Sequence, residues 1–207
     1  MILRIIMLVA VYLIGSVPTG YIMGRIFFGL DIRTSGSGNI GATNALRHMG
    51  VKAGIIVLIL DMLKGCLAVL LMRYFFRGEQ GIIALGAMVV ILGHVFTVFL
   101  GFKGGKGVAT AAGVFMILSP LSFLISILCF TALVLVWRYV SLASMISALV
   151  FYTLNMSEVC CGSYENMPKA VLVTIIVLVI IIKHRSNIGR LIEGTEIKIG
   201  PKKKAEN

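Results

Sequence analysis

Apolar runs alternate with short polar segments along almost the whole chain. A helix that crosses a bilayer needs about 20 apolar residues, with a range of roughly 17–25. The clear candidates are Ile2–Met23, Ala53–Phe76, Gly81–Leu100, Leu121–Trp137 and Val171–Ile182. Two shorter runs are Val108–Leu118, which stops at Ser119-Pro120, and Val140–Met156.

This pattern predicts an all-α fold, a polytopic membrane helical bundle with about seven spans. If the two shorter runs are re-entrant or interfacial segments, five spans remain. Either count places the N-terminus and the C-terminus on opposite sides of the membrane. For 207 residues we expect a single integral membrane domain, 1–207, with a basic tail at 183–207.

Composition supports the bilayer as the solvent of this chain. Hydrophobic residues make up 59% of the sequence and charged residues only 13%, whereas soluble domains are typically about 45–50% apolar and about 25% charged. Arg4 ahead of an apolar stretch is also typical of a signal peptide. However, the hydrophobicity continues to about Phe28 without a small-x-small cleavage site, so we interpret this run as the first span.

The net charge of +11 predicts how the bundle is oriented. Cytoplasmic segments of membrane proteins carry an excess of lysine and arginine. With the C-terminus inside, four basic residues lie outside (Arg4, Arg73, Arg77 and Lys169), and Lys64 lies within a span. Fourteen lie inside: Arg25, Arg33, Arg47, Lys52, Lys103, Lys106, Arg138, Lys183, Arg185, Arg190, Lys198, Lys202, Lys203 and Lys204. We therefore expect the N-terminus outside and the C-terminus in the cytoplasm. We expect no nucleic-acid partner, because the basic residues lie between apolar runs.

The first polar segment, 35–47, has a composition suited to a ligand. It holds three glycines, two serines, two asparagines, a threonine and an arginine. Glycine lets a backbone approach a ligand closely, and the guanidinium of Arg47 is a planar fork that suits phosphate oxygens. A plain cytoplasmic turn is the alternative, although an ordinary turn needs fewer such residues. The candidates here are Ser37, Gly38, Asn39, Thr43, Asn44 and Arg47.

The second segment, Gly101–Gly107, predicts an anion cradle. Backbone N–H groups, lysines and the N-terminus of a helix beginning at Val108 can together hold a phosphate. The segment is not a nucleotide-binding P-loop, because its spacing is too short and Gly107 replaces the hydroxyl that would bind magnesium. We therefore expect phosphate without a nucleotide; a flexible basic loop at the headgroups is the alternative. The candidates are Lys103, Gly104, Gly105, Lys106 and Gly107.

The third segment, 183–196, follows the last span. If that helix continues, His184 and Asn187 lie three residues apart and share a face. A basic juxtamembrane helix that binds acidic headgroups explains these residues as well. Within the spans, we expect Asp61 and Lys64 to form a structural ion pair, because an unpaired charge there is costly.

Several kinds of chemistry are missing from the sequence. Asp31 and Asp61 are the only aspartates, which excludes the aspartate-rich metal motif of CDP-alcohol phosphotransferases. The His-x-x-x-x-Asp pair of acyl-CoA-dependent glycerol phosphate acyltransferases is absent, and no Gly-x-Ser-x-Gly elbow surrounds the loop serines. We expect no metal and no cofactor.

Taken in order, these segments resemble the bacterial acyl-phosphate:glycerol-3-phosphate acyltransferase family, and the resemblance covers the whole chain. The matching motifs are Gly15-Ser-Val-Pro18, Gly36–Asn44 with Arg47, Asp61-x-x-Lys64-Gly65, Gly93-His94, Gly101–Thr110 and His184-x-x-Asn187-Ile-x-Arg190-Leu-x-x-Gly194-x-Glu196.

The resemblance implies an enzyme that moves a fatty acyl group from acyl phosphate to the sn-1 hydroxyl of glycerol 3-phosphate, giving lysophosphatidic acid for phospholipid synthesis. It implies that Ser37 and Arg47 are needed for activity and that the second segment holds glycerol 3-phosphate. His184 and Asn187 would contribute to the active site, whereas Glu196 would be structural. It also implies a multi-pass protein of the bacterial inner membrane, surrounded by lipid, with its active site on the cytoplasmic face.

Acyl phosphate is a mixed anhydride whose phosphate leaves readily, so this chemistry needs no metal. The base for the hydroxyl proton is His184 or a phosphate oxygen of a substrate. We expect Ser37 to bind phosphate rather than to become acylated, because no histidine lies near it in sequence. The alternative function is a transporter for a phosphorylated or anionic solute, which would need polar residues deep in several spans.

Overall fold

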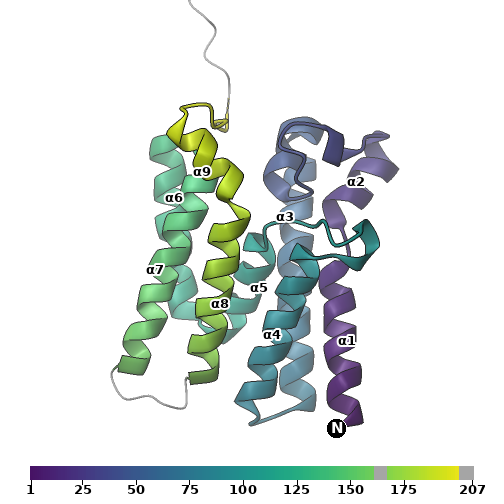
Figure 1. The fold of residues 1–207 in the computed structure, drawn as a ribbon, viewed down its shortest axis with the longest axis vertical. Helices are drawn as coiled ribbons and strands as arrows, with labels where there is room; N and C mark the ends of the chain where they lie inside the picture. Colours follow the sequence, from purple (N-terminus) through teal and green to yellow (C-terminus); the bar gives the residue numbers. More distant parts are fainter. Residues whose placement is uncertain (161–166, 201–207) are drawn as a thin grey trace, which may run out of the picture.

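A computed structural model describes residues 1–160 and 167–200. The longer helices lie side by side in one bundle (Figure 1), and the described residues hold no β-strand, which confirms the all-α prediction. The elements are α1 (Ile2–Ser16), α2 (Thr19–Phe28), η1 (Ile32–Thr34), α3 (Ala42–Phe75), α4 (Gln80–Val95), η2 (Val98–Leu100), α5 (Val108–Leu118), α6 (Pro120–Trp137), α7 (Val140–Cys160), α8 (Met167–Lys183) and α9 (Arg185–Ile192).

Every predicted apolar run lies in a helix or a pair of helices. Among the described residues, four helices are long and apolar enough to cross a membrane alone, and six spans result if each of two bent pairs counts as one. α5 has the predicted bounds, but its 11 residues are too few for a crossing. α7, with 21 residues, is longer than predicted and long enough. The predicted number of spans stays a prediction.

Three breaks depart from the predicted pattern. α1 and α2 meet at 43°, because Pro18 lacks an N–H group and disfavours a helical Val17. α8 and α9 meet at 52° at His184, so the last helix does not continue straight through the third segment. Within α3, Gly50 has a φ of 86° and separates the first turns of α3 from the apolar run that begins at Ala53.

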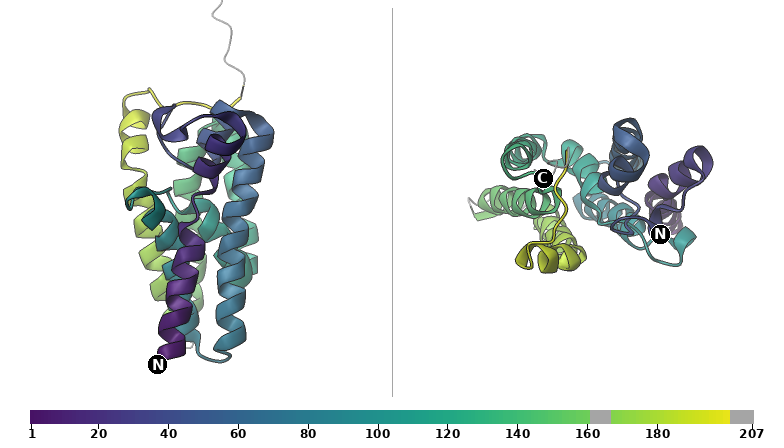
Figure 2. Two further views of the ribbon diagram at one scale, coloured as in Figure 1. Left: turned by 90° about the vertical axis from the view of Figure 1, so that its right-hand side faces the viewer. Right: turned by 90° about the horizontal axis from the view of Figure 1, so that it is seen from above.

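The polar segments gather at one end of the bundle. This end holds α9, the α6–α7 turn and the loop between α2 and α3, whereas α1 begins at the opposite end (Figure 1). The glycine segment 101–107 lies deeper, partway down between the helices. Seen from above, the chain after α9 crosses the bundle toward α6 and α7 (Figure 2). Residues 201–207 of the predicted basic tail lie outside the described residues.

Helices α3 and α5 approach each other closely at two glycines. A Cβ atom on Gly65 would lie 2.2 Å from the carbonyl oxygen of Thr110, and one on Gly113 would lie 1.9 Å from that of Met62. Small residues allow such backbone contact between membrane helices. The contact places the N-terminus of α5, and with it the glycine segment, beside the middle of α3.

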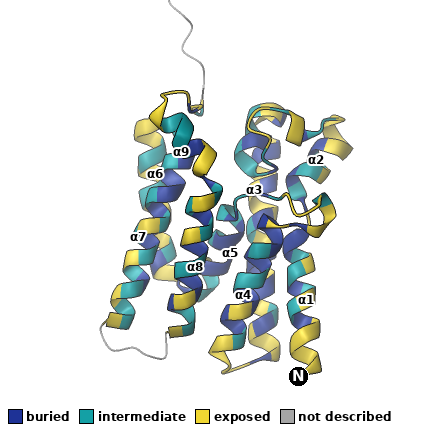
Figure 3. Cartoon of the chain, viewed as in Figure 1, coloured by how far each residue is buried: buried dark blue, intermediate teal, exposed yellow. Residues whose placement is uncertain are grey.

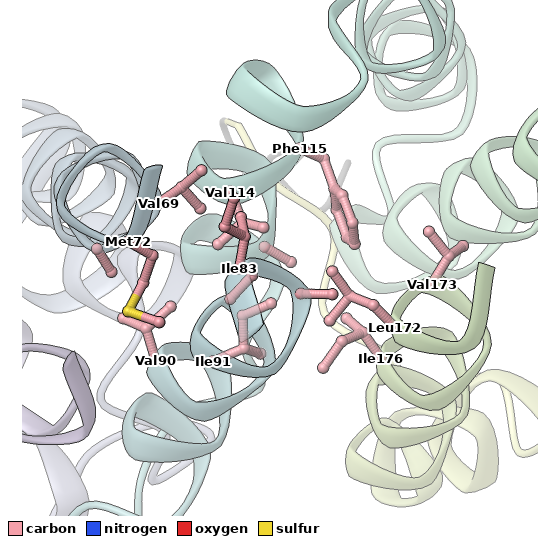
Figure 4. Close-up of a cluster of buried hydrophobic side chains, with 14 of the residues drawn as sticks. Val69, Met72, Ile83, Val90, Ile91, Val114, Phe115, Leu172, Val173 and Ile176 are labelled. Atoms are coloured by element: carbon pink, nitrogen blue, oxygen red, sulfur yellow. The ribbon is translucent and has the colours of Figure 1, made fainter. Parts of the chain in front are cut away.

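An apolar core fills the space between α3, α4, α5 and α8. Val69, Met72, Ile91, Val114 and Ile176 meet there (Figure 4). The outward faces of the helices are largely exposed (Figure 3). Of the 18 residues of α6, only 11% are buried. A bilayer would cover this exposed apolar surface.

Candidate functional site

A pocket of about 330 Å³ lies between α3, α5, α6, α7 and the start of α9. Its lining takes residues from all three predicted segments, so the structure brings together side chains that are far apart in sequence. They are Ser37, Asn39, Thr43, Asn44 and Arg47 from the first segment, Lys106 and Gly107 from the second, and His184, Asn187 and Glu196 from the third.

Four predicted substrate-binding residues do not line this pocket: Gly38, Lys103, Gly104 and Gly105. Lys103 is exposed. The amides of Gly104 and Gly105 donate to the carbonyl oxygens of Val95 (3.1 Å) and His94 (3.0 Å), at the end of α4. These two N–H groups are therefore engaged, and the substrate-binding role of all four residues stays a prediction.

Lys106 is connected to the third segment through Asn187. Its Nζ donates to Oδ1 of Asn187, whose Nδ2 donates to Oε1 of Glu196 at 2.7 Å. The same carboxylate accepts from Ser141 and Arg190, each at 2.7 Å. Burial alone would raise the pKa of the Glu196 carboxyl, but the hydrogen bonds from Ser141, Asn187 and Arg190 bring that pKa below its usual value. Glu196 is thus an anion that accepts hydrogen bonds from Ser141, Asn187 and Arg190; its structural role stays a prediction.

The charge of Lys106 is sensitive to its surroundings. The pKa of Lys106 is lowered to about 8, mainly by burial. The negative charge of Glu196 raises this pKa, whereas the positive charges of Arg190 and Arg47 lower it further. The ammonium form therefore prevails at neutral pH, but by a smaller margin than for an ordinary lysine. A bound phosphate beside it would favour the charged form.

Arg47 and His184 both line the pocket. Arg47 donates through Nη2 to the carbonyl oxygen of Ile197 at 2.8 Å, whereas its buried Nε has no partner. An anionic ligand would satisfy such an N–H group. His184 is buried, with Nδ1 2.8 Å from the carbonyl oxygen of Ile180. Because a carbonyl can only accept, Nδ1 carries the proton and Nε2 of a neutral ring is left as a proton acceptor.

Asn44 braces the first segment. Its Nδ2 donates to the carbonyl oxygens of Ile32, Ser35 and Asn39, and its Oδ1 accepts from the amide of Ser37 at 3.2 Å. All of its polar atoms are thus used within the loop, which it holds in the shape that presents the exposed Ser37 to the pocket.

Sequence reasoning missed the contribution of α7. Ser141 and Ser144 both line the pocket, and Ser141 also bonds Glu196. The available signal was the recurrence of serine at 141, 144 and 147, a spacing of three that places all of them on one helix face.

Much of the remaining lining is apolar, and part of it forms an apolar arm. It consists of Ile55, Leu58, Met62, Val108, Ala109, Ala112, Ile127 and Phe130. Ile55 and Leu58 of α3 are 48% and 41% exposed, and Ile127 of α6 is 37% exposed. The arm therefore connects the polar end of the pocket with the apolar outer surface between α3 and α6.

Comparisons with known proteins agree with this geometry. The sequence profile of a family described as glycerol-3-phosphate acyltransferase matches residues 5–194. A glycerol-3-phosphate acyltransferase of Trichlorobacter lovleyi is 48% identical over 190 residues, 90% of this chain and 93% of that protein. Glycerol-3-phosphate acyltransferase 2 of Bacillus anthracis is 44% identical over 197 residues, 95% of this chain and 100% of that protein.

Two solved structures are also similar. Both are described as PlsY (YgiH), an integral membrane glycerol 3-phosphate acyltransferase, one in a glycerol 3-phosphate form and one in a lysophosphatidic acid form. The first superposes with a TM-score of 0.88 at 36% identity and covers 95% of this chain and 96% of that one. These findings confirm the membrane bundle and the resemblance seen in the sequence. The chain belongs to the glycerol-3-phosphate acyltransferase family.

Proposed function

We propose that this protein transfers a fatty acyl group from acyl phosphate to the sn-1 hydroxyl of glycerol 3-phosphate, giving lysophosphatidic acid and inorganic phosphate. The observation that supports this most is a single pocket with a polar, cationic end and an apolar arm that reaches the lipid-facing surface. Both substrates are anionic, and one of them also has a long apolar chain. The buried Asp61 and His94, which also line the pocket, are the feature that a solute transporter would share, but a transporter would not need the apolar arm.

In this proposal the cationic end holds the two phosphates. Lys106 and the free N–H groups at the N-terminus of α5 bind the phosphate of glycerol 3-phosphate. The guanidinium of Arg47, which lines the pocket, and the exposed side chain of Ser37 bind the phosphate of the donor. Together these groups stabilise the negative charge that develops during transfer.

The transfer itself forms one bond and breaks one bond. The glycerol hydroxyl oxygen attacks the acyl carbonyl carbon, and the bond from that carbon to the phosphate oxygen breaks, so that inorganic phosphate leaves. The hydroxyl proton goes to Nε2 of His184 or to a phosphate oxygen of a substrate. Holding the two reactants about 3–3.5 Å apart supplies most of the acceleration.

The acyl chain lies along the apolar arm. Ile55, Leu58 and Ile127 bound this arm where it meets the outer surface, so the chain extends from the bilayer and needs no transfer through water. We also propose that the bundle lies in the bacterial inner membrane with the pocket facing the cytoplasm. The fourteen-to-four distribution of lysine and arginine supports this orientation.

The test is turnover by the purified protein. Palmitoyl phosphate and labelled glycerol 3-phosphate, in EDTA and without CoA or ATP, should give labelled lysophosphatidic acid. Palmitoyl-CoA should give none. Product formed only from palmitoyl-CoA, or only after magnesium is added, would contradict the proposed donor or the metal-free chemistry.

A further inference from the structure

A buried cluster of polar side chains lies beside the glycine segment and takes part in none of the steps above. Asp61, Lys64 and His94 are 1%, 7% and 4% exposed. A buried ion pair is weak support for stability, because the desolvation of both charges offsets much of their attraction. The position of this cluster suggests another role for it.

One oxygen of Asp61 is the centre of the cluster. Oδ1 lies 2.8 Å from Nζ of Lys64 and accepts from the hydroxyl of Thr19. Nζ of Lys64 also donates to the carbonyl oxygen of Val17 at 2.9 Å. These contacts fix Asp61 against the break between α1 and α2. The fourth group is His94, whose Nδ1 lies 3.6 Å from the same Oδ1 and has no hydrogen-bond partner.

The other edge of the His94 ring supports the glycine segment. A Cβ atom on Gly105 would lie 2.0 Å from Nε2 of His94, so only glycine fits there. The amide of Gly105 donates to the backbone oxygen of His94 at 3.0 Å. The imidazole is thus wedged between Asp61 and the residue that precedes Lys106. Asp61, His94 and Lys106 all line the same pocket.

We propose that His94 is a positioning residue for glycerol 3-phosphate. The carboxylate of Asp61, 3.6 Å from Nδ1, attracts the imidazole electrostatically without a hydrogen bond. The imidazole sets the position of Gly105, which in turn places the Lys106 ammonium and the first N–H groups of α5. The inference rests on the proposed function in assigning glycerol 3-phosphate to Lys106. It predicts that breaking the link between Asp61 and His94 weakens the binding of that substrate selectively.

The experiment measures glycerol 3-phosphate binding by titration calorimetry, together with KM for both substrates. H94F keeps a ring against Gly105 but removes the nitrogen that faces Asp61. H94Q keeps a polar group near Gly105 and also loses that contact. Each should raise Kd and KM for glycerol 3-phosphate by about 10- to 100-fold, the size expected for misplaced binding groups. KM for acyl phosphate should stay within a few-fold of wild type.

A double-mutant cycle with K106A tests the route of the effect. If His94 acts through Lys106, H94F should add little to the loss already caused by K106A, because the two losses are coupled rather than additive. The matched control is T97V, since Thr97 is also buried, between α4 and η2, but donates to the carbonyl oxygen of Ser16 and does not contact Asp61. T97V should lower Tm and leave Kd unchanged.

Three results would overturn the inference: wild-type Kd in both folded His94 variants, an equal rise of Kd in T97V, or additive losses in the cycle. If H94F does not fold, the result for H94Q decides.

The proposed function is tested by different results, obtained with wild-type protein. Wild-type protein that binds glycerol 3-phosphate but makes no product from palmitoyl phosphate would contradict the reaction and leave the binding test in place. Wild-type protein that does not bind glycerol 3-phosphate would overturn both.

Discussion

At the scale of single residues, Asn187 joins two segments that are 81 positions apart. Its amide accepts from Lys106 through Oδ1 and donates to Glu196 through Nδ2. An amide can do both at once through two separate atoms, whereas a carboxylate has no donor and an ammonium has no acceptor. The lysine and the glutamate are thereby held in place without direct contact, and the charge of Lys106 remains available to a ligand.

The lowered pKa of Lys106 predicts a pH dependence of substrate binding. Lys106 loses its charge as the pH rises through about 8, so KM for glycerol 3-phosphate should be flat below about pH 7 and should rise as the pH passes through and beyond 8. Lys106→Arg should have a higher KM that stays flat to about pH 10, because arginine keeps its proton. Steady-state kinetics at each pH measure this. A rise of equal steepness in the arginine variant would assign the titration to another group.

Arg47 should not tolerate lysine. Its Nη2 donates to the carbonyl oxygen of Ile197 while the guanidinium also lines the pocket. A lysine ammonium lacks the planar fork that could do both. Arg47→Lys should therefore lose nearly as much kcat/KM as Arg47→Ala, about 10- to 150-fold for one charged hydrogen bond. Arg33→Lys is the control, since Arg33 pairs with Asp31 in the same loop but is exposed. Wild-type activity in Arg47→Lys would show that charge alone suffices there.

A side-chain contact can be predicted from the sequence when the two residues lie close together in the chain. Asp61 and Lys64, three apart, were predicted as a pair and lie 2.8 Å apart. The use of Asn44 as a brace was not foreseeable from composition. Its four hydrogen bonds go to a loop whose path is set by tertiary folding, and the same side-chain chemistry would also suit a ligand.

At the scale of elements, hydropathy locates helices well and their interruptions poorly. The bounds of α5 were predicted as they are found. The break at Pro18 has a local cause that the sequence contains. The 52° bend at His184 has no proline and no other local signal in the sequence. His184 and Asn187, on either side of the start of α9, both line the pocket.

The close contact of α3 and α5 should be sensitive to one added methyl group. A Cβ on Gly113 would lie 1.9 Å from the backbone oxygen of Met62, so Gly113→Ala must push the helices apart and displace the start of α5. We expect a loss of about 1–3 kcal/mol of stability and a higher KM for glycerol 3-phosphate. Gly81→Ala is the control, since no atom lies within 4 Å of its Cβ position. Equal thermal unfolding temperatures of both variants would contradict this packing argument.

At the scale of the whole molecule, the site is assembled by bringing three loops to one end of the bundle. The segment after α9 completes it. The amide of Ile199 donates to the carbonyl oxygen of Arg138 at 2.9 Å, and Nε of Arg138 donates to the carbonyl oxygen of Ile199 at 2.8 Å. Arg47 donates to the carbonyl oxygen of Ile197, two residues before Ile199. Residues 195–200 thus connect α9 to the α6–α7 turn and pass beside the pocket, which Ile199 lines. The residues after Glu196, for which the sequence predicted no role beyond the basic tail, thus include one that lines the site.

The orientation of the whole bundle can be tested with cysteines at its two ends. Basic residues favour the cytoplasm, and the end that holds the pocket also holds most of them, so Ser37 and Arg185, both exposed, should face inward. In a background where Cys160 and Cys161 are replaced by serine, Ser37→Cys and Arg185→Cys should resist a membrane-impermeant maleimide in intact cells and react once the cells are opened. Gln80→Cys, exposed at the start of α4 at the other end, should react in intact cells. Labelling of Ser37→Cys or Arg185→Cys from outside, with Gln80→Cys protected, would show that the bundle has the opposite orientation in the membrane. The enzyme would then have to draw glycerol 3-phosphate from the outer side, which contradicts the proposed cytoplasmic site.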